Sequence, residues 1–279
     1  MSRELIRRYV EANHARDFDA LRGMRHPGWT AEWPQSGERV PSHDADVAIH
    51  EAYPGYPAHQ LAHVAGRDER WTLAPTMTPV RVVGAGGVWA AELLLDYGDG
   101  RRYHSPGIVE LRDGLVWRET VYWAAPFEAP AWRADLVEAI EAGAVDVSAD
   151  GGPEEEEAHV EAVRRYADAA AAGDLASALR GLYHEDAVED IPQSGERVRG
   201  VERMIAIVER HPATPRLELR RAAPIGNVVL TEKGLRYGDD LWLEFAVKEF
   251  RGDRVARVTE YFAQPFEAPE WRARWVERL

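Results

Sequence analysis

The 279-residue sequence contains no cysteine, only four methionines, and far fewer basic than acidic side chains. Without cysteine the protein has no disulfide, no thiolate nucleophile and no Cys-ligated zinc. Its 34 Lys and Arg against 48 Asp and Glu give a formal charge of -14 at pH 7, which disfavours binding to a phosphate backbone or an anionic membrane surface. We therefore expect neither nucleic acid nor a membrane as a partner.

Long hydrophobic runs are lacking as well, since no stretch approaches the roughly 20 apolar residues of a membrane span. The opening MSRELIRRYV has no apolar signal-peptide core, so we expect a cytoplasmic protein. A content of 45% hydrophobic and 29% charged residues is typical of a soluble globular chain. This length favours two domains, each large enough to bury its own core.

The sequence repeats itself. PQSGERV occurs at residues 34–40 and again at 192–198, and PFEAP-x-WRA occurs at 126–134 and again at 265–273. Repetition in the same order indicates a duplication. It predicts a first copy at 1–138 with an insertion near 55–72, an acidic flexible linker at 139–158, and a second copy at 159–279.

Both copies have the same order of secondary-structure patterns. Each opens with helical spacing of apolar residues, and Asp17 and Asp174 are candidate caps of a second helix. Strand-like runs then follow at 78–83, 88–97, 103–111 and 115–123, and again at 216–221, 227–237, 241–250 and 254–262. Helices followed by hairpin-linked strands predict an α+β fold, with N-terminal helices packed on a curved antiparallel sheet.

These patterns carry a resemblance. Each copy resembles a SnoaL-like domain of the nuclear transport factor 2-like superfamily, and VRRYADAAAAGDLASALRGLYHEDAVED at 163–190 is similar in order and spacing to the opening of Δ5-3-ketosteroid isomerases. The resemblance implies two tandem cone-shaped barrels, each with a pocket between helices and sheet. It also implies that Tyr166 donates a hydrogen bond to a substrate oxyanion and that Asp190 moves the proton. By position, Tyr9 and Glu32 take these roles in the first copy.

A Tyr and an Asp supply what proton abstraction next to a carbonyl requires, namely a carboxylate base and a donor where negative charge develops. The isomerases add an acid at the position of Ala246, whereas here Glu244 lies two residues earlier on the same strand face. The resemblance therefore implies a cofactor-independent enzyme of the isomerase, cyclase or dehydratase class. Its substrate would be a hydrophobic carbonyl compound.

Several alternatives remain open from the residues alone. Tyr166 also fits a core position in an apolar helix stripe, and Asp190 also fits the cap of the turn that follows it. If both residues have only these structural roles, the protein is a non-catalytic binder of a hydrophobic small molecule, or a protein-interaction module with an exposed apolar sheet face. Because related domains pair through their sheets, we expect the two copies to form an intramolecular pseudo-dimer.

Aromatic residues and histidines complete the candidate site. The ten Trp and ten Tyr favour a flat hydrophobic ligand, and the residues expected to line the pocket are His26, His184, Trp33, Trp123, Trp242 and Tyr261. His59 and His63 have helical i, i+4 spacing, but prolines precede them and no HExxH pattern is present. We therefore predict no metal site.

Overall fold

The computed structural model describes residues 2–54, 76–96, 102–140, 147–148 and 151–279. The chain folds into two compact units. The first unit contains residues 1–123, 144–147 and 265–279, and the second contains 124–143 and 148–264. The segments that end each predicted copy are thus exchanged between the units, and each unit is described below by itself.

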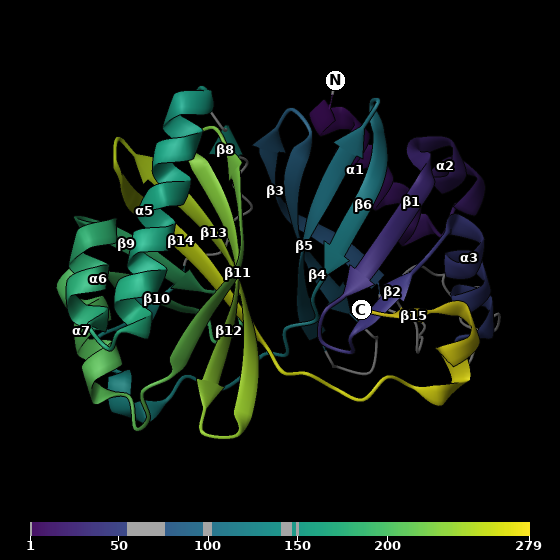
Figure 1. Cartoon of the computed structure of the whole chain (residues 1–279). Coiled ribbons are helices and arrows are strands. Elements are labelled where there is room, and N and C mark those ends of the chain that lie inside the picture. Colours follow the sequence, from purple (N-terminus) through teal and green to yellow (C-terminus); the bar gives the residue numbers. More distant parts are fainter. Residues whose placement is uncertain (1, 55–75, 97–101, 141–146, 149–150) are drawn as a thin grey trace. The chain divides into compact units, whose positions relative to one another are not determined.

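In the first unit α1, α2 and α3 lie on one face of a sheet (Figure 1). The sheet order is β15-β2-β1-β6-β5-β4-β3-β8. The elements are α1 (Ser2–Ala15), α2 (Phe18–Met24), β1 (Arg25–Trp33), β2 (Glu38–Val40), α3 (His43–Ala52), β3 (Thr76–Ala85), β4 (Val88–Asp96), β5 (Arg102–Arg112), β6 (Leu115–Val121), β8 (Val147–Ser148), the 3-10 helix η2 (Glu270–Trp275) and β15 (Glu277–Arg278).

The second unit repeats this architecture, with its sheet in the order β11-β12-β13-β14-β9-β10-β7 (Figure 1). Its elements are the 3-10 helix η1 (Ala131–Arg133), β7 (Glu138–Ala139), α5 (Pro153–Ala171), α6 (Leu175–Leu182), β9 (Tyr183–Ile191), β10 (Glu196–Arg199), α7 (Val201–Arg210), β11 (Arg216–Ile225), β12 (Val228–Tyr237), β13 (Asp240–Arg251) and β14 (Arg254–Ala263).

The predicted α+β class is confirmed, and three details differ from the expectation. The strand pairs β1–β6 and β9–β14 are parallel, so both sheets are mixed rather than antiparallel. Within the described residues each sheet runs from one edge strand to another, so the cones are open rather than closed barrels. The predicted linker is partly helical, because α5 begins at Pro153.

Local signals place the helices where the sequence predicted them. The Asp17 side chain accepts from the Ala20 amide at 2.9 Å, and Asp174 accepts from Ser177 at 3.2 Å, so each caps the second helix of its copy. The apolar stripe of α7 buries Val201, Met204 and Ile205 against the sheet. No helix in the described part of the chain is both long and apolar enough to cross a bilayer.

The two repeated motifs bind each other crosswise, which explains the exchanged tails. We call residues 124–140 and 265–279 the first and second tails. In the first unit Gln35 bonds both the amide and the carbonyl of Trp123, and its own carbonyl accepts from the Phe266 amide at 2.9 Å. In the second unit Gln193 bonds the amide and carbonyl of Phe262 in the same way, and its own backbone carbonyl accepts from the Phe127 amide of the first tail at 3.1 Å. Each PQSGERV turn is therefore a dock for a tail.

An ion pair and a short strand complete each dock. Arg272 of the second tail donates two hydrogen bonds to the Glu38 carboxylate, and Arg133 of the first tail donates two to Glu196. The donor–acceptor distances are 2.5 to 3.2 Å. Both acids are buried. The tails then add β15 to β2 and β7 to β10. Tail binding thus explains why the Gln and Glu of PQSGERV and the Arg of PFEAP-x-WRA occur in both copies.

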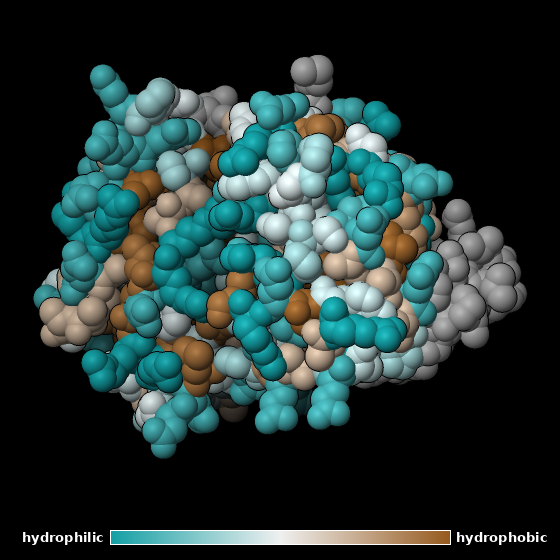
Figure 2. Space-filling view, turned by 45° about the vertical axis from the view of Figure 1, so that its right-hand side comes forward, coloured by the Kyte–Doolittle hydropathy of each residue, from teal (hydrophilic) through white to brown (hydrophobic). Residues whose placement is uncertain are grey.

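On the face shown in Figure 2, hydrophilic side chains surround small hydrophobic groups. Among the described residues, the large hydrophobic side chains classed as exposed are Phe266 at 40% and Leu279 at 53%, both in the second tail. Isolated exposed apolar residues of this kind are normal on soluble proteins. They give no positive support to the protein-interaction module.

Candidate functional site

The helix-covered face of the second sheet carries a group of ionisable side chains. Strand register places them in rows: Lys233 lies opposite Glu244, Lys248 lies opposite Val258, and Glu260 lies opposite Ala246. The next strand contributes Glu189, which lies opposite Val258. Since Ala246 and Val258 belong to the core beneath the helices, the ionisable side chains on that face point into the core. We call Glu189, Lys233, Glu244, Lys248 and Glu260 the inner-face cluster.

Short polar contacts join these residues. Lys233 Nζ lies 2.5 Å from Glu244 Oε1, and Lys248 Nζ lies 3.4 Å from Glu260 Oε1. Lys248 also donates to the Tyr183 hydroxyl at 2.9 Å. The cluster therefore contains two ammonium–carboxylate pairs within one small region.

The fifth member, Glu189, shares a proton with Glu260. Burial and the adjacent Glu260 carboxylate raise the pKa of Glu189 well above its ordinary value. Burial opposes ionisation of Glu260 too, but the charges of Lys248 and Lys233 and a hydrogen bond from Glu189 hold the pKa of Glu260 below its ordinary value. Two carboxyl groups in hydrogen-bond contact need a proton between them, and Glu189, which has the higher pKa of the two, is the partner that holds it and donates to Glu260.

Tyr166 of α5 faces this cluster. Lys233 Nζ lies 5.4 Å from the centroid of its ring, and the ring of Tyr183 lies edge-on at 6.4 Å. Burial raises the pKa of Tyr166, so its hydroxyl keeps its proton and remains a donor. Thr231, directly opposite Ala246 on the same face, has a buried Oγ1 with no hydrogen-bond partner among the described residues. Both hydroxyls are suited to a polar ligand atom.

The fold does not require these charges, because the first copy builds the same sheet without them. Strand registers align the cluster with aliphatic and small residues of the first unit. In the order given above for the cluster, the equivalent residues are Ala31, Leu93, Ser105, Val109 and Val121. Five ionisable side chains at positions where apolar or small ones suffice indicate a role other than folding.

The first unit has a smaller polar group at different positions. The Tyr9 hydroxyl donates to Glu119 and accepts from Arg25 Nε at 2.7 Å, and Arg25 pairs with Asp46 at 2.7 Å. The indole of Trp29 also donates to Glu119, at 2.7 Å, and is itself buried. Bulky side chains thus fill this interior and satisfy its polar atoms, which is typical of a structural network.

The predicted acids of the two copies lie outside these groups. Asp190 follows Glu189 on β9 and so points to the opposite face, where it accepts from Arg197 at 2.6 and 3.0 Å and from Arg257 at 2.6 Å. Burial opposes its ionisation, but these hydrogen bonds hold the pKa of Asp190 below its ordinary value. Glu32 pairs in the same way with Arg39 at 3.0 Å. The structure therefore does not bring Asp190 together with Tyr166, and its catalytic role stays a prediction.

The predicted histidines lie at the starts of strands β1 and β9. His184 bonds the carbonyl of Arg251 at 2.7 Å, and His26 accepts from the Gly28 amide at 3.0 Å and lies 3.8 Å from Asp113. Neither contacts the inner-face cluster. Their predicted roles in substrate binding therefore gain no support from this geometry.

The predicted aromatic residues divide between the two faces. In the first unit Trp33 and Trp123 pack edge to face at 5.7 Å, and Arg272 lies over Trp33. In the second unit Trp242 lies two residues from Glu244 and shares its face, whereas Tyr261 follows Glu260 and packs on Phe245 on the other face. Of the predicted residues, Glu244, Trp242 and Tyr166 share the inner face.

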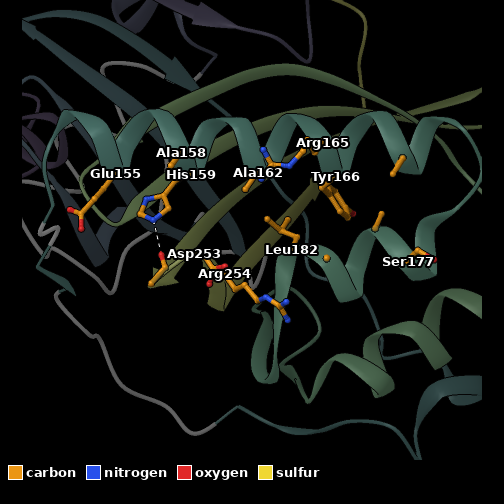
Figure 3. A pocket seen from close by; sticks show the side chains of 14 residues that line it. Glu155, Ala158, His159, Ala162, Arg165, Tyr166, Ser177, Leu182, Asp253 and Arg254 are labelled. Carbon is orange, nitrogen blue, oxygen red and sulfur yellow. Dashed lines mark hydrogen bonds between the residues drawn. The ribbon is translucent and has the colours of Figure 1, made fainter.

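A groove of about 570 Å³ runs along α5 and α6 and reaches Tyr166 (Figure 3). Its floor consists of small and apolar residues such as Ala162 and Leu182, and Arg165 and Arg254 lie at its rim. At one end His159 bonds the carbonyl of Gly252 at 2.8 Å. Asp190 does not line this groove, whereas Tyr166 borders both the groove and the inner-face cluster.

The residues that sequence reasoning missed are Glu189, Lys233, Lys248 and Glu260. A position-by-position comparison of the two copies could have found them, because the second copy has charged residues where the first copy has aliphatic ones. No group of three or more potential metal ligands occurs in the described ranges. His59 and His63 lie outside those ranges.

No protein-family model matches the sequence, and no curated protein is significantly similar to it. Solved structures are similar. An NTF-2 like protein of unknown function from Burkholderia xenovorans is 39% identical over 45% of this chain and 98% of its own, with a TM-score of 0.43. A putative ketosteroid isomerase from Kribbella flavida is 25% identical over 45% and 92%, with a TM-score of 0.41. A putative SnoaL-like polyketide cyclase from Jannaschia is 19% identical over 40% and 90%, with a TM-score of 0.35.

The fold class is a pair of α+β units, each with helices on one face of a curved sheet. The 39% identity extends over nearly the whole of the Burkholderia protein. The chain therefore belongs to the NTF2-like superfamily, as its resemblance to SnoaL-like domains predicted. That match covers less than half of the chain, in keeping with two tandem copies.

Proposed function

We propose that the second unit is a cofactor-independent acid–base enzyme that moves a proton on a hydrophobic carbonyl compound, in the isomerase, cyclase or dehydratase class. One observation carries the proposal: strand register brings Glu189 and Glu260 together on a buried core face, at positions where the first copy has Ala31 and Val121. Burying such a pair in a core costs stability, and buried titratable groups with shifted pKa values are typical of functional sites. About 12% of the Glu260 side chain is exposed, so the pair is not sealed off.

The roles of the residues follow from their charges. The Glu260 carboxylate takes the proton from the carbon next to the carbonyl, and the C–H electron pair moves onto the carbonyl oxygen as an enolate. Lys233 and the Tyr166 hydroxyl are the donors available to that oxygen. Burial alone would lower the pKa of Lys233, but Glu244 raises it, so the ammonium stays charged. Glu189 carries the proton that returns to the product carbon, and the proton on Glu260 then restores the pair.

Proton exchange is the direct test, because it requires only the first step. The intact protein is incubated in D₂O with a panel of cyclic and aryl ketones, and loss of the α-proton signal is followed by NMR. We expect Glu260→Gln to lower exchange at least about 100-fold, which is the usual range for loss of a general base. We expect Asp190→Asn, in a protein that remains folded, to exchange within a few-fold of the parent rate.

The opposite result would favour the sequence-based prediction. If Asp190→Asn abolishes exchange while Glu260→Gln retains it, Asp190 is the base and the inner-face cluster is structural. If the parent exchanges no proton on any ketone that it binds, the enzyme proposal is refuted.

A non-catalytic binding function is the second candidate, and the groove at Tyr166 favours it. Its volume of about 570 Å³ is within the usual range for sites that hold a small organic molecule. A carrier would bind hydrophobic ketones with the same affinity after Glu260→Gln, measured by calorimetry. It would also lose affinity when Ala162, on the groove floor, is replaced by Trp.

A further inference from the structure

The first tail carries a positive charge to the edge of the second unit's inner face. Arg133 Nε lies 2.9 Å from Glu196 Oε1 and its Nη2 lies 2.5 Å from Glu196 Oε2. Arg133 is 9% exposed and Glu196 is 3% exposed. A planar two-point contact between buried groups fixes the guanidinium in one place.

Strand register locates this pair beside the inner-face cluster. Glu196 lies opposite Ile191, and Val198 lies opposite Glu189, in the β9–β10 pair. Glu189 and Ile191 are two residues apart and so share a face, which makes Glu196 and Glu189 diagonal neighbours, about 7 to 8 Å apart. Asp190 and Arg197 lie on the opposite face.

Arg133 supplies the positive charge that balances Glu196 on this face. With Glu189 protonated, the three carboxylates of Glu196, Glu244 and Glu260 face the two lysines of the cluster and Arg133. Uncompensated buried charge is strongly disfavoured. Without Arg133, the Glu196 carboxylate would be an uncompensated negative charge close to Glu189, so the charge felt by Glu189 depends on a residue from the first copy.

The first unit contains the same device without the cluster. Arg272 forks onto Glu38, which lies opposite Trp33, and Val40 lies opposite Ala31. Ala31 is the residue equivalent to Glu189. The first unit thus has the same arginine–glutamate pair, with an alanine at the position of Glu189.

We propose that Arg133, a residue of the first copy, is a positioning residue of the second unit's site. Held by Glu196, its charge sets how readily Glu189 gives up the proton that it shares with Glu260. The proposal deepens the function proposed above, since it concerns the same site. The guanidinium charge is one of the influences that lower the pKa of Glu189 against the larger effect of burial.

Other charged groups face Glu189 and remain unchanged in the experiment. They are Glu260 of β14, Lys248 and Glu244 of β13, Lys233 of β12 and Glu196 of β10. Tyr166 of α5 and Tyr183 of β9 are neutral at neutral pH, since burial raises the pKa of each.

The test compares Arg133→Met with the mirror variant Arg272→Met in the full chain. The readout is the titration midpoint of the Glu189 carboxyl, followed by its ¹³C chemical shift and assigned with Glu189→Gln. We expect both variants to lose similar stability, because both break a buried fork. Only Arg133→Met raises the Glu189 midpoint, by about one pH unit for a charge at this separation. Arg133→Lys restores most of the midpoint.

A second variant changes the sign. Glu196→Gln removes a negative charge and leaves Arg133, so the Glu189 midpoint falls below that of the parent. This variant also covers the case in which Arg133→Met fails to fold. Equal titration midpoints of Glu189 in the parent, Arg133→Met and Glu196→Gln would overturn the proposal. Arg133 would then serve only to hold the first tail on the second unit.

The measurement separates this inference from the proposed function because it needs no substrate. A shifted midpoint in a protein without turnover supports the inference and refutes the enzyme proposal. If Glu260→Gln abolishes turnover but Arg133→Met leaves the pH profile of turnover unchanged, the enzyme proposal is supported and the inference about Arg133 is refuted.

Discussion

Glu189 and Asp190 are adjacent residues whose neutral replacements should change stability with opposite dependence on pH. Glu189 has its pKa raised in the folded protein, so the stability that it contributes is complete below its unfolded pKa of about 4.3 and is lost as pH rises. Glutamine keeps the donor to Glu260 and removes the titration. Glu189→Gln therefore gains stability over the parent as pH rises.

The size of the effect follows from linkage. Each pH unit between the unfolded and folded pKa values is worth about 1.4 kcal/mol. The gain of Glu189→Gln over the parent should thus grow by up to about 1.4 kcal/mol per pH unit above pH 4.3, and level off once the folded pKa is passed. Urea unfolding from pH 4 to 9, followed by circular dichroism, measures it.

Asp190→Asn is the matched control. Two arginines hold the pKa of Asp190 low, so its contribution is present above its unfolded pKa of about 3.9 and is lost as pH falls. Asp190→Asn should be less stable than the parent at pH 7, and the deficit should shrink in acid. Parallel profiles for the parent and Glu189→Gln would refute the assignment of a shared proton.

The remaining predictions concern the cluster as a whole and one dock. Lys248→Val alone should lower the free energy of unfolding by about 3 to 5 kcal/mol, because it leaves Glu260 without its partner. A triple variant that adds Glu189→Ala and Glu260→Val has the first copy's residues at all three positions and should recover most of that loss. Urea unfolding measures both variants. Failure of the triple variant to recover would show that the charges are needed for folding. Gln193→Ala should cost about 1 to 3 kcal/mol, since it leaves backbone groups of Phe262 unpaired, and a loss below about 0.5 kcal/mol would contradict the dock.

Local signals predicted much of the fold. The caps at Asp17 and Asp174 and the strand runs that follow each helical region depend on neighbours in sequence, and the structure has them within a few residues. The crossing of the tails was not predictable, because the two PQSGERV docks are identical and both tails carry the PFEAP-x-WRA motif, so either pairing fits the sequence. Only long-range packing selects between them.

The structure brings only some of the predicted site residues together. Tyr166 faces the buried charges, and the carboxylates that act on it are Glu244, Glu260 and Glu189. Strand residues alternate between faces, so Asp190, next to Glu189, lies on the other side of the sheet, and its catalytic role stays a prediction. Lys233 and Lys248 belong to no sequence motif, and only strand register shows that they lie beside the buried carboxylates.

The crossed tails also bear on how the duplicated halves can change over generations. Each half supplies a fastener that the other needs, so a replacement in either PQSGERV turn or either tail weakens the neighbouring unit. At interior positions the two halves differ, with Glu189 and Glu260 in one half where the other has Ala31 and Val121, whereas the residues that fasten the tails are the same in both halves.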